Sequence, residues 1–422
     1  MSKRKYPQET LDRIIELSLK GFSSRRICDE LGWKRSKKSG INRVLTDFRS
    51  GKVGYSKEVD DMEEDWFIED VTLDSLCESE DFNLSNLAKR LRTAQRSNNQ
   101  LRKIQRQTLD PVLQLDDVLK GITKAVTTQE IKTEKLATFK ENPSSQNAIV
   151  EVLFSDFQIG KVGQYYNTDL AKRAISKYGK EVVKNISERS GKYKYDKIVL
   201  AMLGDLLEDH LKHGVQSAMA TDSGLSEQIS NATLLIWNHV IKPLAKLGIP
   251  MEVICIAGNH GSSQHKGMDM YKAGLFSYDY PIYKTQEALC KEAGLNHVNF
   301  IIPEGVFGYT DFYGNWAVYE HGYFNSATEK SMEDQMKKRG QQMKRHVEYF
   351  RCGDMHHLCS YDCHKLVLNG AFFGTDTDGV EYSGIIGFNS VPAQAMMFHT
   401  PEKSLGRNTV KEFITIQVAD GY

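Results

Sequence analysis

"KIVLAMLGDLLEDH", residues 197–210, is a short apolar run that ends at Gly204 and Asp205. β-Branched and large apolar residues over such a length are typical of a buried strand, and the glycine marks where the strand ends. A second run, "MEVICIA" at 251–257, ends in the same way at Gly258, Asn259 and His260. From about residue 147 onward such runs alternate with amphipathic helical stretches, which predicts an α/β domain.

Polar residues follow five of the predicted strands. These strand ends carry SDFQ at 155–158, GD at 204–205, GNH at 258–260, HG at 321–322 and GDMH at 353–356. Because open α/β sheets place their ligands beyond the carboxyl ends of the strands, we expect all five motifs on one side of a sheet. Oxygen and imidazole ligands without thiolates suit Mn²⁺, Mg²⁺, Fe or Zn²⁺, and Asp205 can bridge two such ions.

The order of these five motifs resembles that of the calcineurin-like metallophosphoesterase superfamily, over about residues 147 to 400. The resemblance implies a four-layer α/β/β/α sandwich with a dinuclear metal centre, whose bridging hydroxide attacks a phosphate ester. His260 resembles the family's non-ligand histidine, which contacts the phosphate and helps to protonate the leaving group. The resemblance assigns Asp156, Gln158, Asp205 and His356 to the first ion, and Asp205, Asn259, His321 and Asp354 to the second.

Two of these positions depart from the family pattern. Gln158 stands where the family usually has His, and Asp354 stands where the first His of a GHxH motif belongs. Both are capable ligands, and replacing imidazole by oxygen favours harder ions, so Mn²⁺ or Mg²⁺ is preferred over Zn²⁺. The alternative is a decayed site that binds no metal, against which stand the family residues that are retained: Asp156, Asp205, Asn259, His260, His321 and His356.

The last motif lies within "RCGDMHHLCSYDCH", residues 351–364, which also resembles a zinc knuckle. Cys352, Cys359, Cys363 and His364 would supply its four ligands. Cys352, however, ends an apolar strand, where a buried free thiol is common, and the fifth motif is due at this point. We therefore favour Asp354 and His356 as the working residues. The segment that follows, 369–398, resembles the closing part of phage-type metallophosphoesterases and is expected to wall the active site.

The first 55 residues predict a separate all-α domain. Apolar residues recur at helical spacing in three short stretches, a pattern that resembles the helix-turn-helix domains of resolvases and transposases. Cations in this segment would then face DNA phosphates or a groove, although a helical bundle with a solvated basic face fits the pattern too. The candidate DNA-binding residues are Arg25, Arg26, Lys34, Arg35, Lys37, Lys38 and Arg43.

Charge is segregated along the chain, although Lys and Arg total 55 and Asp and Glu total 55. An acidic linker at 56–82 precedes a basic helical arm at 83–145, and the phosphoesterase domain occupies 146–422. Because fields act over roughly 8 to 10 Å, such segregation matters more than the net charge. The arm is expected to contact DNA or a partner chain, with a solvated connecting helix as the alternative.

Composition excludes several classes of protein. No apolar run approaches the roughly 20 residues of a membrane helix, and the basic N-terminus has no apolar core behind it. The 7 cysteines lack framework spacing, so we expect reduced thiols and a cytoplasmic location, the host's if a phage encodes the chain.

The sequence thus favours a metal-dependent phosphoesterase that acts on DNA as a nuclease. A phosphomonoesterase of nucleotides or phosphoproteins, and a DNA-binding scaffold with a decayed metal site, remain as alternatives. DNA is the expected partner, no membrane partner is expected, and homo-oligomers and repair or replication proteins stay open.

Overall fold

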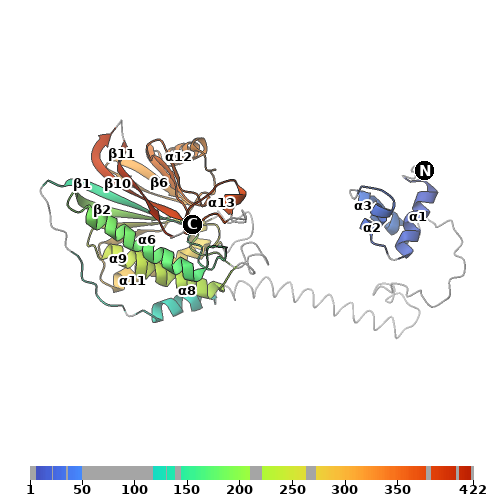
Figure 1. The fold of residues 1–422 in the computed structure, drawn as a ribbon, viewed down its shortest axis with the longest axis horizontal. Coiled ribbons are helices and arrows are strands. Elements are labelled where there is room, and N and C mark those ends of the chain that lie inside the picture. Colours follow the sequence, from blue (N-terminus) through green and yellow to red (C-terminus); the bar gives the residue numbers. More distant parts are fainter. Residues whose placement is uncertain are drawn as a thin grey trace. The chain divides into compact units, whose positions relative to one another are not determined.

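A computed structural model describes the chain in ten stretches: residues 6–20, 22–34, 37–49, 117–129, 131–137, 144–209, 221–262, 272–376, 382–404 and 408–419. The chain divides into two compact units, 1–101 and 102–422, which we take separately (Figure 1). Arg35, the side chain of Lys38, the acidic linker 56–82 and residues 83–116 of the basic arm lie outside the described residues.

The described part of the first unit contains three helices, α1 (Gln8–Leu19), α2 (Ser24–Glu30) and α3 (Lys38–Arg49). Pro7 stands at the N-cap of α1, and the side chain of Ser23 caps α2 by accepting the Arg26 N–H at 3.5 Å. As the helical spacing predicts, one apolar face of each helix points inward. The buried residues are Leu11, Ile14, Leu17, Ile27, Cys28, Ile41, Val44 and Leu45.

The second unit contains a mixed six-stranded sheet, whose strands lie in the order β11-β10-β1-β2-β3-β4. Its four parallel strands are β1 (Gln146–Phe154), β2 (Tyr193–Met202), β3 (Met251–Cys255) and β4 (Val298–Ile301). On the other side of β1, β10 (Ala393–Ser404) and β11 (Asn408–Gln417) continue the sheet in antiparallel register.

The other sheet has five strands in the order β5-β6-β7-β9-β8. Its strands are β5 (Phe307–Phe312), β6 (Asn315–Glu320), β7 (Val347–Cys352), β8 (Cys359–Tyr361) and β9 (Leu366–Leu368). β6, β7 and β9 run parallel, whereas β5 and β8 pair antiparallel at the two edges.

Helices pack on both sheets. Those described are α6 (Thr168–Glu188), α8 (Leu225–Ile236), the π-helix η2 (Trp237–Ile241), α9 (Lys242–Ala245), α10 (Ala273–Phe276), α11 (Asp279–Glu292), α12 (Glu329–Met343) and α13 (Tyr382–Ile385). Val150 and Val152 of β1 belong to the core beneath α6 and α8, whereas Ile149 and Leu153 pack with Tyr319 of the other sheet. Strands buried on two faces read as continuous apolar runs, which explains the sequence pattern.

Part of the predicted basic arm lies on the second unit. Residues 117–127 are helical, and Val118 and Ile122 pack against the core beneath α6 and α8. Further along, Glu134 pairs with Lys242 at 3.1 Å and with Lys246 at 3.0 Å. The described residues 117–129 and 131–137 thus contact this unit through Val118, Ile122 and Glu134.

The five polar motifs do not follow the strands of a single sheet, so that prediction was wrong. Three of them follow β1, β2 and β3, and the other two follow β6 and β7 of the second sheet. Apolar composition identifies a buried strand, but it does not tell which of two stacked sheets the strand joins. Among the described residues, no helix is both long and apolar enough to cross a membrane.

Candidate metal centre

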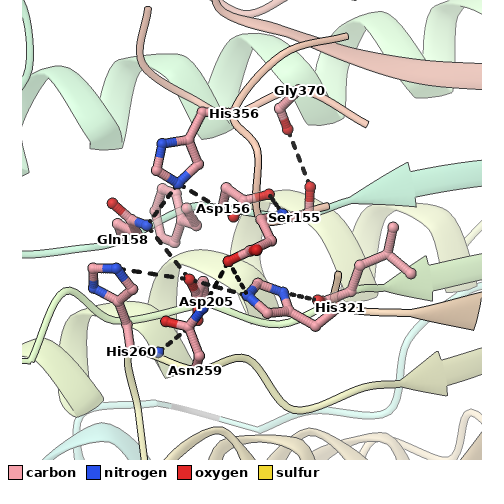
Figure 2. A network of polar contacts seen from close by, with 12 residues as sticks. Ser155, Asp156, Gln158, Asp205, Asn259, His260, His321, His356 and Gly370 are labelled. Atoms are coloured by element: carbon pink, nitrogen blue, oxygen red, sulfur yellow. Dashed lines mark hydrogen bonds and ion pairs between the residues drawn. The ribbon is translucent and has the colours of Figure 1, made fainter. Parts of the chain in front are cut away.

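The carboxyl ends of strands from both sheets converge on one cluster of polar side chains (Figure 2). The cluster receives Asp156 and Gln158 after β1, Asp205 after β2, Asn259 and His260 after β3, His321 after β6, and Asp354 and His356 after β7. The structure therefore brings together every residue that the sequence analysis assigned to the catalytic and metal-binding positions.

Asp156, Asp205 and His321 form the centre of the cluster. All three side chains are completely buried, and one ligand atom of each lies within 4.8 Å of the others. Nε2 of His321 lies 3.2 Å from Oδ2 of Asp205. Within the described part of the chain, no other three His, Cys, Asp or Glu side chains gather closely enough to hold a metal ion.

Gln158 and His356 lie beside Asp156. Nε2 of Gln158 lies 3.1 Å from Nε2 of His356 and 3.5 Å from Oδ2 of Asp205. Nε2 of His356 is 3.6 Å from Oδ1 of Asp156. A half-turn of the Gln158 carboxamide exchanges its nitrogen and oxygen, which directs an acceptor oxygen to the same neighbours. The four side chains predicted for the first ion are therefore linked by contacts of Gln158 with Asp205 and His356 and of His356 with Asp156.

Asn259 and Asp354 complete the second predicted set. Nδ2 of Asn259 donates a hydrogen bond of 2.6 Å to Oδ1 of Asp354, which lies 3.4 Å from Nε2 of His321. Nδ1 of His321 donates to the carbonyl oxygen of Leu203 at 2.7 Å, as a carbonyl can only accept. In the neutral ring this bond fixes the tautomer, so that Nε2 carries the lone pair that a metal ligand needs.

Five of the predicted ligands have a left-handed backbone. The φ angle is 51° at Asp156, 39° at Gln158, 53° at Asp205, 70° at Asp354 and 54° at His356. Such angles are uncommon for residues other than glycine, cost of the order of 1 kcal/mol or more, and concentrate at functional sites. The strain is consistent with loops whose shape serves their ligands.

Two glycines allow the loops after β2 and β3 to touch. A Cβ atom at Gly204 would lie 2.3 Å from the backbone nitrogen of Gly258, and one at Gly258 would lie 2.0 Å from Oδ1 of Asp205. A side chain at Gly204 would displace the backbone of the loop after β3, and one at Gly258 would displace Asp205. The glycine of each motif is therefore required by packing at the centre of the cluster.

Burial and neighbouring charges set the ionisation of the central residues. Burial raises the pKa of Asp156 to about 6, although His356 and His321 oppose the shift. Burial also opposes the charge on Asp205, but His321 and His260 hold its pKa below the usual range. For His321 burial disfavours the imidazolium, yet Asp205 and Asp354 raise its pKa well above the ordinary value.

Several buried polar atoms in this cluster have no hydrogen-bond partner. They are Oδ1 of Asp156, Oε1 of Gln158, Nε2 of His321 and Oε2 of Glu208, each within the described residues. Leaving such an atom unpaired costs about 1–3 kcal/mol, so native structures rarely do so without compensation. Carboxylate and amide oxygens with an imidazole nitrogen are ligands that divalent ions accept. The residues present therefore fit a divalent metal ion.

His260 lies at the edge of the cluster and is held by Glu208. Its backbone N–H donates to Oδ1 of Asp205 at 2.8 Å, and its Nδ1 donates to the carbonyl oxygen of Glu208 at 2.9 Å. The Glu208 carboxylate lies 3.4 Å from the same Nδ1, and Nε2 of His260 is 4.0 Å from Oδ2 of Asp205. The side chain is 12% exposed, so the ring is partly accessible from outside the cluster.

The sequence analysis missed Asp279, which supports two of the loops. Its completely buried carboxylate accepts the Gly258 N–H at 2.9 Å and the Leu206 N–H at 3.3 Å. Burial raises its pKa to about 6, and those two N–H groups oppose the shift. Asp279 begins α11 and belongs to none of the five motifs, so no local pattern marks it.

The sequence analysis also missed Glu208. A signal was present, because this acidic residue lies only three positions after Asp205 of the GD motif.

The closing segment 369–398 contributes to the wall of the site, as expected. Phe373 packs edge-on against His356 with 4.8 Å between ring centroids. Gln394 accepts the Ser155 N–H at 3.0 Å, and Asn369 donates to the Ser155 hydroxyl at 2.9 Å. These contacts fix the first motif from behind.

The cysteine-rich alternative does not assemble. Cys352 is buried and accepts a hydrogen bond from Asn325 at 3.4 Å, while Cys363 is exposed. The ring of His364 stacks on Phe413 at 4.4 Å. Among the described residues these thiols form no group that could hold a metal ion. The geometry therefore does not support a zinc knuckle in this stretch.

The candidate DNA-binding residues of the first unit lie at its surface. The described ones, all exposed, are Arg25, Arg26, Lys34, Lys37 and Arg43. Arg26 lies 4.1 Å above the ring of Phe22, and Lys37 lies 5.0 Å above that of Trp33. Side chains that contact phosphates must be accessible at the surface, and these are. DNA binding itself stays a prediction.

No protein-family model and no curated protein matches this chain, whereas some solved structures do at low identity. A Vps29 single mutant from Entamoeba histolytica shares 11% identity over 63% of this chain and 98% of that chain, with a TM-score of 0.26. A novel archaeal phosphodiesterase shares 9% over 63% of this chain and 98% of that chain, at 0.28. A putative 5'-nucleotidase from Staphylococcus aureus shares 9% over 65% of this chain and 55% of that chain, at 0.29. Likenesses of this size decide neither the fold nor the activity of this chain.

Proposed function

We propose that this chain is a metal-dependent phosphoesterase of the calcineurin-like type and that its substrate is DNA. The catalytic unit would be the family's four-layer α/β/β/α sandwich with two divalent ions. The proposal rests chiefly on the buried group of Asp156, Asp205 and His321, whose polar atoms include two without hydrogen-bond partners in the described structure. Such a group is costly to fold unless a ligand compensates it.

Each side chain of the cluster has a role in this proposal. Asp205 would be shared by the two ions, and Mn²⁺ is favoured because oxygen ligands outnumber imidazoles. When bound, divalent ions supply a nucleophile at neutral pH and neutralise charge on the phosphoryl group. The remaining ligands are Asp156, Gln158 and His356 for the first ion, and Asn259, His321 and Asp354 for the second.

His260 would act on the leaving group. Its Nδ1 is committed to the Glu208 carbonyl, so Nε2 is the nitrogen that faces the cluster. As an imidazolium, it can hydrogen-bond a phosphate oxygen and then give its proton to the departing ester oxygen. Because the ring is partly exposed, a large substrate can approach it from outside.

The exposed cations of the first unit favour DNA as the substrate. Five of the seven candidate residues are described and exposed on or beside the helices α1 to α3, where they can contact phosphates. A nucleic-acid partner would explain why basic residues gather there in a chain whose net charge is zero.

The proposal is tested by cleavage of single- and double-stranded DNA with Mn²⁺, alongside an aryl phosphodiester and an aryl phosphomonoester. The wild-type chain should cut DNA and the diester, and His260→Ala should cut DNA far more slowly. His346→Ala, which removes a histidine side chain that is 65% exposed, is the matched control and should behave as wild type. Hydrolysis of the monoester alone would overturn the nuclease reading and leave the phosphatase alternative.

A separate variant tests the role of the first unit. Arg25→Gln combined with Arg43→Gln should weaken DNA binding while leaving hydrolysis of the aryl diester unchanged. Equal DNA affinity in variant and wild type would remove the first unit from the proposal without affecting the metal centre.

A further inference from the structure

A basic groove lies on the second unit between α6 and the π-helix η2. It has a volume of about 550 Å³ and is lined by Lys172, Arg173, Ser176, Lys177, Lys180, Glu181 and His239. The lining side chains include four cations and one carboxylate, whereas over the whole chain the number of Lys and Arg equals the number of Asp and Glu. Such a local excess attracts a polyanion regardless of the net charge.

The cations repeat along the helix axis. Lys172, Ser176 and Lys180 are four residues apart on α6, and so are Arg173 and Lys177, so two neighbouring rows run along one face. Each step of four residues advances about 6 Å along the axis. A row of this kind matches a chain of phosphates better than it matches a single small anion.

The groove is available to a ligand. Lys172 pairs with Asp169 at 3.0 Å, but the side chains are 46% and 80% exposed, so solvent weakens the pair and a phosphate can replace it. Within the described residues, no carboxylate lies at ion-pair distance from Arg173 or Lys180. Burial and the charge of Lys180 lower the pKa of His239, so its neutral ring can share hydrogen bonds with a ligand in the groove.

The backbone fixes the shape of the groove. At Gly179 the two helices touch so closely that a Cβ atom would lie 1.7 Å from the carbonyl oxygen of His239. The contact places His239 next to Lys180, and η2 is a π-helix, a rare element that is frequent at functional sites.

The helix that carries the groove starts where the catalytic loop ends. Asn167 caps α6 by accepting the Leu170 N–H at 2.9 Å, and the Thr168 N–H donates to Asp222 at 2.8 Å. Asp156 and Gln158 of the candidate metal centre lie at the start of the same connection, which runs from β1 to α6. Lys172 and Arg173 lie in the first two turns of α6, at the end of the helix that follows this connection.

We propose that the α6–η2 groove binds the phosphodiester backbone of a nucleic-acid strand whose scissile bond lies in the metal centre. The inference rests on the proposed function, and it adds a second contact surface, on the catalytic unit itself. Phosphate contacts release counterions, so binding at the groove contributes to the salt dependence of affinity. It carries little base specificity, because backbone contacts position a strand without reading its sequence.

The test compares two charge-matched triple variants of the full chain. The first, Arg173→Gln, Lys177→Gln and Lys180→Gln, removes three cations from the groove, and the second removes three exposed lysines of α12 by Lys330→Gln, Lys337→Gln and Lys338→Gln. Affinity for a DNA oligonucleotide is measured without divalent ions at several salt concentrations. The groove variant should lose roughly tenfold or more in affinity at low salt, and its log–log salt slope should fall by about 2 to 3.

The α12 variant should keep the wild-type slope, and both variants should hydrolyse an aryl phosphodiester at the wild-type rate. Equal losses in the two triple variants, or none in the groove variant, would overturn the inference. Failure of the proposed function would show differently, as a wild-type chain that does not cleave DNA. An acidic phosphopeptide that competes as well as DNA of equal charge would also overturn the choice of nucleic acid.

Discussion

Nε2 of His321 lies 3.2 Å from Oδ2 of Asp205, and both side chains are completely buried. The carboxylates of Asp205 and Asp354 raise the pKa of His321 well above its ordinary value against the effect of burial. The raised pKa favours the imidazolium form, in which Nε2 carries a proton that must leave before this nitrogen can hold a metal ion. Metal binding and proton release must be coupled at this position.

We predict that Mn²⁺ affinity rises with pH up to the raised pKa of His321. Below that pKa the ion competes with the proton, so the apparent affinity should change by about tenfold per pH unit. Calorimetric titration in two buffers of different ionisation enthalpy measures the proton released. An affinity that is independent of pH from 6 to 8, with no proton release, would contradict the coupling, and His346→Ala should titrate as wild type.

The effect of His260→Ala should depend on the leaving group. If Nε2 gives its proton to the departing oxygen, the variant should lose about 10²- to 10⁴-fold in kcat on DNA, whose leaving alkoxide is strongly basic. An aryl phosphodiester with an acidic phenol needs little protonation, so the loss there should be small. Rates for a series of aryl esters, plotted against phenol pKa, measure this difference. A loss of equal size for all of them would indicate a role in binding the phosphate instead.

Gly258→Ala should abolish metal binding without unfolding the chain. The added Cβ would lie 2.0 Å from Oδ1 of Asp205, so the carboxylate or its loop must move. Gly163→Ala is the control, because a Cβ at Gly163 meets no heavy atom within 4 Å in the described structure. Mn²⁺ titration and circular dichroism of both variants separate loss of the site from loss of the fold. Wild-type Mn²⁺ affinity in Gly258→Ala would show that Asp205 is not a ligand.

Asp279→Asn should weaken metal binding from outside the ligand set. The carboxylate accepts N–H groups from the loops after β2 and β3, whereas an amide can accept only through its oxygen. Leaving one buried N–H unpaired should cost about 1–3 kcal/mol of stability and loosen the spacing between Asp205 and Asn259. Urea unfolding and Mn²⁺ titration measure the two effects. Asp334→Asn on the exposed face of α12 should change neither, and an unaltered Mn²⁺ affinity in Asp279→Asn would refute the support role.

The sequence analysis predicted the strands and motifs that form the site, but it did not predict how those strands are divided between two sheets. The predicted strand at 251–257 contains β3, and the residues expected at the five strand ends meet in one cluster. These features follow from apolar runs that end in polar motifs, which are local patterns. The assignment of β6 and β7 to a second sheet depends on long-range packing, which the local periodicity of the sequence does not encode.

Other features of the site were beyond the reach of sequence patterns. The left-handed backbone at Asp156 and Asp205 is imposed by the surrounding loops, because aspartate adopts it only occasionally and no local pattern marks the positions where it does. Asp279 acts through two backbone N–H groups that are far away in sequence. In the first unit the helical periodicity identified the buried Ile14, Ile27 and Ile41, while the DNA-contacting role of its surface stays a prediction.

A buried carboxylate between the sheets should govern stability in acid. Glu151 of β1 accepts hydrogen bonds from Arg351 of β7 at 2.9 Å and 3.0 Å and from the Tyr319 hydroxyl at 2.7 Å. Burial opposes its charge, but Arg351 and His399 lower its pKa to about 2. A carboxyl group whose pKa is lower in the folded chain than in the unfolded chain stabilises the fold above its ordinary pKa. That contribution, about 3 kcal/mol, is lost as the pH falls from about 4.5 to about 2.

Glu151→Gln should therefore destabilise the chain by about 3–5 kcal/mol at pH 7, since it leaves the guanidinium of Arg351 buried without a countercharge. The deficit should shrink between pH 4.5 and pH 2, because the wild-type carboxylate becomes neutral in that range while the variant has no charge to lose. Urea unfolding at pH 7, 4.5, 3 and 2 measures it, with Glu304→Gln at an exposed position as the control. A deficit that stays constant across this range would mean that the negative charge of Glu151 does not contribute to stability through its pairing with Arg351.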